Sequence, residues 1–230
     1  MSCFLFVPKR LRSVGLGSLA LLLAGCASKP PVPDWQLNAH GASQRAVQAY
    51  FEGRQRVERA EFARARSEIS RTGDAGQLAR LELLRCAAQV ASLDLTPCTP
   101  FDVLAQDATP AERAYARYLA GRAEPADLVL LPQAQRAAGS AAPEQAATVV
   151  AALADPLARL VAAGVQFARA QASPQLVALA VDTASQQGWR RPLLAWLGVQ
   201  EQLAEARGDA TEAARVRRRI AIASQDAQRD

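Results

Sequence analysis

The sequence predicts an all-α protein, built either as a solenoid of helical hairpins or as an irregular helix bundle. Its composition supports this, because the chain is rich in Ala, Leu, Gln, Glu and Arg, which favour helices. Aromatic residues make up 5% of the chain, and no segment alternates β-branched with polar residues in a way that predicts a strand. A capping residue followed by proline, a common helix start, recurs three times: Thr109-Pro110, Asp155-Pro156 and Ser173-Pro174.

The first three helices are predicted over residues 43–54, 57–70 and 75–93. In the second, Phe62 and Ile69 belong to one apolar stripe at helical spacing. The third is apolar on two sides, which indicates a helix packed between neighbours.

Proline and glycine residues divide the middle of the chain into further helices. A short helix is predicted over residues 101–108, and Thr109 and Glu112 have the spacing of a capping box. Further helix starts are predicted at Pro125, Pro132, Pro143 and Pro192, and helix ends at Gly121, Gly139 and Gly188.

A helix is predicted over residues 156–170, with Gly164 in its interior. Glycine costs about 1 kcal/mol against alanine there, which suggests that another helix crosses at close range. The last two helices are predicted over residues 192–207 and 211–223, joined by a turn at Gly208-Asp209.

This last pair resembles one tetratricopeptide repeat. The matching positions are Leu197, Ala204, Gly208, Asp209, Ala213 and Ile220. Glu201 stands where the family prefers Gly or Ala, and Gln200 where it prefers Leu. The resemblance covers about one repeat and implies a solenoid of helical hairpins.

The N-terminus is built like an export signal. Lys9, Arg10 and Arg12 precede a short apolar run over residues 14–23, too short for the roughly 20 residues of a membrane-spanning helix. The tetrad Leu23-Ala24-Gly25-Cys26 resembles the lipobox of bacterial lipoproteins. This resemblance implies cleavage before Cys26 and lipidation of Cys26; the alternative is an ordinary secretory signal with an incidental cysteine.

The same resemblance implies a location and a domain organisation. Ala27 stands where an aspartate commonly retains such proteins in the inner membrane, so the resemblance favours the periplasmic face of the outer membrane over the inner membrane. We therefore predict a signal peptide (1–25), a lipidated cysteine with a proline-rich tether (26–34) and one helical domain (35–230). The tether is short, which keeps the domain close to the membrane.

Charge and cysteine usage agree with export. The precursor carries +5, but the leader takes three basic residues with it, and the remaining +2 gives little support for nucleic-acid binding. Cys86 and Cys98 remain after removal of Cys3 and lipidation of Cys26, and we predict that they form a disulfide. A metal site is not expected, because the one histidine, His40, lies far from both cysteines in the sequence.

A candidate binding surface is formed by Trp189, Arg190, Arg191 and Trp196, a stretch with two of the three tryptophans. An arginine stacked on tryptophan suits a carboxylate or phosphate ligand. The alternative, which we favour, is a helix-start anchor in which the tryptophans fill the core.

The motifs favour a non-enzymatic function. The sequence has no phosphate-binding glycine loop, no zinc-protease motif and no nucleophile elbow, and we expect no cofactor. We therefore expect a membrane-anchored helical scaffold that binds another envelope protein. The alternatives are a cell-wall enzyme or its ligand-binding accessory, and a carrier of lipids or small molecules.

Overall fold

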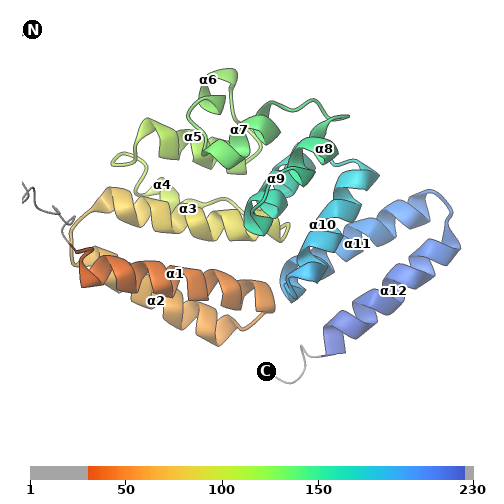
Figure 1. Cartoon of the computed structure of the whole chain (residues 1–230), viewed down its shortest axis with the longest axis horizontal. Coiled ribbons are helices and arrows are strands. Elements are labelled where there is room, and N and C mark those ends of the chain that lie inside the picture. The colour runs from red at the N-terminus through yellow and green to blue at the C-terminus, as the bar shows by residue number, and fades with distance from the viewer. Residues whose placement is uncertain (1–30, 226–230) are drawn as a thin grey trace, which may run out of the picture. The chain divides into compact units, whose positions relative to one another are not determined.

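The computed structural model describes residues 31–225, which form twelve α-helices and no strand (Figure 1). The first six are α1 (Asp34–Glu52), α2 (Gln55–Ser70), α3 (Ala75–Ala91), α4 (Thr99–Asp102), α5 (Pro110–Leu119) and α6 (Pro125–Leu128). The others are α7 (Gln133–Ser140), α8 (Ala146–Ala151), α9 (Pro156–Ala168), α10 (Pro174–Gln186), α11 (Arg190–Ala206) and α12 (Ala210–Ser224). The all-α prediction is confirmed. The predicted signal peptide, Cys26 and the first residues of the tether lie outside the described residues.

The predicted cap–proline starts of α5, α9 and α10 are confirmed. The Thr109 hydroxyl accepts a hydrogen bond from the Glu112 amide at 3.3 Å, and the Glu112 carboxylate accepts one from the Thr109 amide at 2.7 Å. Asp155 accepts a hydrogen bond from the Ala158 amide at 2.9 Å, and the Ser173 hydroxyl accepts one from the Leu176 amide at 3.2 Å. These side chains satisfy amides that have no partner within the helix.

Several predicted boundaries are wrong by a turn or more. Helix α1 begins at Asp34 rather than at residue 43, because its first turns bury Ala39 and Ala42 against a small apolar cluster. The short helix predicted over 101–108 is instead the four-residue α4, which ends at Asp102, and residues 103–107 form turns. Helix α8 begins after Pro143, at Ala146.

Pro192 and Gly139 also have roles other than those predicted. Pro192 lies inside the first turn of α11, which begins two residues earlier. Gly139 lies within α7, where an added Cβ would come within 3.1 Å of side chains of Leu128 and Leu131. The glycine therefore allows close packing instead of ending the helix.

Helix α3 lies at the centre of the described residues. It packs against α5 and α9 and also against α1 and α2, which lie on the other side of it in Figure 1. The prediction of a helix packed between neighbours is confirmed. A Cβ on Gly164 of α9 would lie 2.9 Å from the Val90 carbonyl carbon of α3, so the predicted close crossing is also confirmed.

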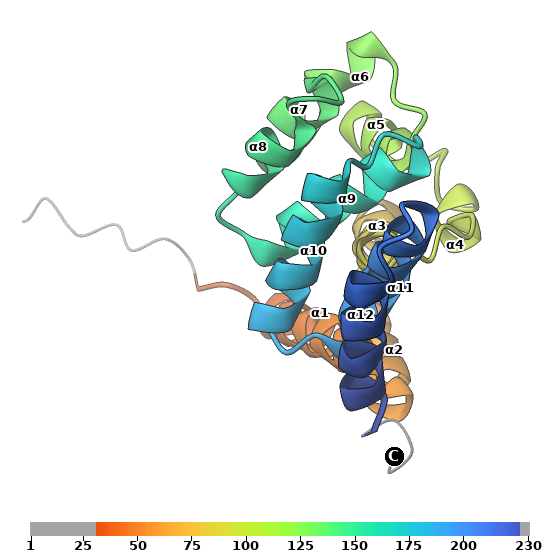
Figure 2. The same ribbon diagram turned by 90° about the vertical axis from the view of Figure 1, so that its right-hand side faces the viewer.

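Neighbouring helices pack as adjacent pairs, above all α1 with α2, α10 with α11, and α11 with α12 (Figure 2). This agrees with the hairpin character predicted from the sequence. Among the residues that the structure describes, no helix combines the length and the hydrophobicity needed to cross a bilayer.

Candidate functional site

A groove of about 670 Å³ lies between α3, α5, α9 and the segment that leads into α7. We call it the α3 groove. Leu83, Leu84 and Ala87 of α3 and Leu157 and Val161 of α9 give it apolar walls. Its volume falls in the range of about 300–1,000 Å³ that is usual for small-molecule sites.

A buried hydrogen-bond network holds the segments around the groove together. The Tyr118 hydroxyl of α5 donates to the Gln135 side-chain oxygen at 2.8 Å. The Gln135 side-chain nitrogen donates in turn to the Ala158 carbonyl of α9 at 3.1 Å. Both polar ends of the Gln135 amide are therefore satisfied, and the start of α7 is fixed to α5 and α9.

Two carboxylates reach the groove, and both act as helix caps. Glu112 accepts hydrogen bonds from the Arg80 guanidinium and from the Thr109 amide. Burial raises the pKa of Glu112, but these hydrogen bonds outweigh burial, and the pKa lies below its usual value. Asp155 accepts the amides of the first turn of α9. Glu112 is therefore not arranged as a general acid, because a general acid at neutral pH needs a raised pKa.

The groove also contains two polar side chains that keep at least one hydrogen-bond donor without a partner among the described residues. Tyr115 of α5 and Arg136 of α7 both line it. The Arg136 Nε donates to the Leu131 carbonyl at 2.9 Å, and no acidic side chain of the described residues forms an ion pair with Arg136. These two residues were not singled out in the sequence, where each resembles an ordinary helix residue.

The two tryptophans of the candidate surface are buried. Trp196 is fully buried and donates its indole N–H to the Ala91 carbonyl of α3 at 3.0 Å. Trp189 donates to the Gln48 side chain of α1 at 3.1 Å, and its ring lies 4.5 Å from that of Phe51. These contacts join α11 to α1 and α3.

The two arginines of this stretch also contact α1. The Arg191 Nε donates to the Tyr50 carbonyl at 2.8 Å, and its guanidinium lies 4.4 Å from the centre of the Tyr50 ring. The Arg190 guanidinium lies where a side chain on Gly53 would otherwise be. The four residues thus have the contacts expected of a helix anchor, and a ligand-binding role for them stays a prediction.

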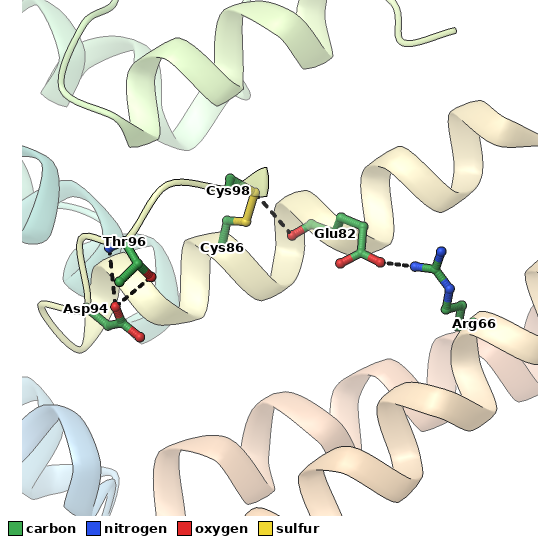
Figure 3. The surroundings of a disulfide bond; sticks show 6 residues. All are labelled: Arg66, Glu82, Cys86, Asp94, Thr96 and Cys98. Atoms are coloured by element: carbon green, nitrogen blue, oxygen red, sulfur yellow. Dashed lines mark hydrogen bonds and ion pairs between the residues drawn. A yellow bond between two sulfur atoms is a disulfide. The ribbon is translucent and has the colours of Figure 1, made fainter. Parts of the chain in front are cut away.

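The predicted disulfide between Cys86 and Cys98 is confirmed, with Cα atoms 5.9 Å apart (Figure 3). It ties α3 to the loop before α4, in which the Thr96 hydroxyl donates to the Asp94 carboxylate at 2.8 Å. A second hollow, of about 480 Å³, lies beside this loop and includes Arg113 and Arg117. Both arginines are already engaged, Arg113 by backbone carbonyls and Arg117 by Asp127.

Within residues 31–225, no group of three or more His, Cys, Asp or Glu side chains is placed to hold a metal ion. No protein-family model, no curated protein and no solved structure matches this chain.

Proposed function

We propose that the chain is a lipid-anchored protein of the cell envelope, held at the periplasmic face of the outer membrane, whose helical body binds another envelope protein. The tetrad that ends at Cys26 carries this proposal. The disulfide supports it, because such bonds persist in oxidising compartments such as the periplasm.

Lipidation is tested by replacing Cys26. The Cys26→Ser chain should lose the lipid from its N-terminal peptide, as measured by mass spectrometry, and should leave the membrane fraction or keep its leader. Cys3→Ser is the matched control, because Cys3 lies in the same leader but outside the tetrad, and it should fractionate as the natural chain does. Two chains that behave alike would contradict the anchor.

The outward face of α12 is the surface we assign to the protein partner. Helix α12 packs on α11. Ile222, near the C-terminal end of α12, is 69% exposed. Arg218 lies one turn before Ile222 on the same face and is exposed, and it forms no ion pair with another described residue. The face suits a partner that offers an apolar contact beside an acidic side chain.

Crosslinking in intact envelopes tests this surface. Crosslinked protein recovered with the natural chain should be lost with Ile222→Glu. Val103→Glu is the matched control, because Val103 is 73% exposed but lies on another part of the fold. If both variants recover the same proteins, α12 is not the docking surface.

The α3 groove favours a second candidate function, the binding of a small-molecule ligand. Its apolar walls and its two unused donors are the observations that support this function.

A further inference from the structure

The α3 groove offers a hydroxyl that has no partner in the protein. No hydrogen bond joins the Tyr115 hydroxyl to another side chain or backbone group of the described residues. Burial raises the pKa of Tyr115, and the negative charge of Asp155 adds to the effect. The hydroxyl therefore stays protonated at neutral pH and can donate to a ligand atom that lies in the groove.

Arg136 offers the second donor. Its Nε–H is held by the Leu131 carbonyl, which orients the guanidinium at the groove and leaves the terminal N–H groups for another acceptor. A planar guanidinium with free terminal donors is suited to a carboxylate.

The acidic side chains of the groove already accept hydrogen bonds from the protein. The Glu112 oxygens are taken by Arg80 and by the Thr109 amide. The Asp155 oxygens are taken by the amides of Leu157 and Ala158. Each of these oxygens thus has a donor within the protein, whereas the Tyr115 hydroxyl and the terminal N–H groups of Arg136 have no acceptor among the described residues. This difference favours a ligand with an anionic, acceptor-rich head.

The rest of the groove favours an apolar body on that ligand. Leucine and valine side chains of α3 and α9 line it. Leu130 on its edge is 40% exposed, and the neighbouring Val129 is 71% exposed. Covering such side chains contributes about 25 cal/mol for each Å² of apolar surface removed from water.

We propose that the α3 groove binds a single molecule of an amphipathic carboxylate. Arg136 and Tyr115 donate hydrogen bonds to its head, and its alkyl chain lies against the leucines. This site depends neither on the lipid anchor nor on the α12 surface. It rests on the second candidate function, ligand binding in the α3 groove, and names the class of ligand, so its failure would leave the anchor and the α12 surface untouched.

Photolabelling of the full chain in a total cell lysate tests the proposal. The probe is a hexadecanoate that carries a diazirine and a terminal alkyne, and labelled peptides are mapped by mass spectrometry after chymotryptic digestion. Label is expected on peptides from α5 and from residues 130–136. Dodecanoate should compete for the label, whereas its methyl ester should compete about tenfold less well, because the ester lacks the charge that a guanidinium recognises.

Paired variants locate the site. Ala134 lines the groove and is exposed, so Ala134→Trp fills the groove from its edge and should reduce labelling by about tenfold or more. Ala137 is exposed on the same helix but does not line the groove, so Ala137→Trp should label normally. Equal labelling of the two variants would place the ligand elsewhere and overturn the proposal.

A second pair tests the head group. Arg136→Gln should reduce labelling several-fold and remove the preference for the acid over the ester. Arg59→Gln is the control, because Arg59 also donates its Nε to a backbone carbonyl but lies outside the groove, and it should have no effect.

Vesicles of phosphatidylglycerol are added as a further competitor. Competition by vesicles but not by dodecanoate would mean that the protein binds a membrane surface and not a single ligand molecule. Equal competition by the acid and its methyl ester would mean that the groove does not recognise a charged head.

Discussion

Helices α3 and α9 meet in two different ways along their length. At Val90 and Gly164 they touch so closely that α9 has no room for a side chain. Two turns earlier, at Leu83 and Leu157, the same helices line the α3 groove. At one end of the helix pair, a single small residue allows close contact. At the other end, larger side chains line an open space. We therefore expect the crossing to contribute stability, and the proposed ligand site lies where the two helices leave open space.

The largest expected effect comes from closing the crossing. Gly164→Ala would place a Cβ 2.9 Å from both the Val90 carbonyl carbon and a Val90 methyl group. Because backbone cannot move aside cheaply, we expect a loss of about 3 kcal/mol in the free energy of unfolding. Urea unfolding followed by circular dichroism measures it.

Gly198 provides the control for Gly164. It also lies inside a helix, but an added Cβ there has no atom within 4 Å. Gly198→Ala should therefore stabilise the protein by about 0.5–1 kcal/mol through helix propensity. A stable Gly164→Ala variant that matches Gly198→Ala would contradict the close crossing.

Removing the disulfide is expected to cost slightly less. Cys86 lies one turn before Val90 on α3, so the bond to Cys98 holds the loop beside the crossing and not the groove. The Cys86→Ala, Cys98→Ala double variant should lose about 2–3 kcal/mol, because the unfolded chain gains the freedom that the bond removes. Labelling of the α3 groove should persist in the folded variant, and loss of labelling would show that the two ends of α3 are not independent.

Much of the crossing could be predicted from the sequence, and little of the groove could. An interior glycine in an otherwise regular helix is a local signal, and Gly164 indicated the crossing without further information. Caps such as Thr109 and Asp155 are equally local, and they set the helix starts correctly. The start of α1 could not be placed, because Ala39 and Ala42 show their role only through burial against distant residues.

The groove is assembled from four segments that are far apart in the chain. Tyr115 and Arg136 line the same space only after α5 packs on α3 and α7 packs on α9. The stretch that contains Trp189 and Arg191 is rich in aromatic and basic residues, and in the structure these residues join α11 to α1. A local cluster of aromatic and basic residues does not by itself distinguish a binding site from a packing contact, since both use the same residue types.

A smaller effect is expected from two tyrosines at the groove. Tyr118→Phe leaves the Gln135 oxygen without its donor and should cost about 1–2 kcal/mol in the free energy of unfolding. Tyr115→Phe removes a hydroxyl that has no partner, so stability should change by less than about 0.5 kcal/mol. Thermal unfolding of the two variants measures the difference. Equal losses would mean that the Tyr115 hydroxyl is used by the protein.

The smallest effect concerns the face of α3 that turns away from the groove, where the Arg66 guanidinium contacts Glu82 (Figure 3). Burial raises the pKa of Glu82 despite the nearby positive charges of Arg66 and Arg85, and one carboxylate oxygen has no hydrogen-bond partner. The folded state therefore holds this proton more tightly than the unfolded state does. The stability that Glu82 contributes is fully present below its unfolded pKa, near 4.5, and declines as pH rises through the folded pKa.

Glu82→Gln removes this titration, so its stability should improve relative to the natural chain as pH rises above about 4.5.

Asp127 is the opposite case. A two-point hydrogen bond from Arg117 and the Glu124 amide lower its pKa to about 2. Asp127→Asn should therefore lose stability relative to the natural chain at neutral pH, and the loss should shrink as pH falls from 3.8 towards 2. Urea unfolding at a series of pH values measures the free energy of unfolding of each variant relative to the natural chain. With rising pH this difference should increase for Glu82→Gln and decrease for Asp127→Asn. Parallel curves for the two variants would contradict the opposite pKa shifts of the two carboxyl groups.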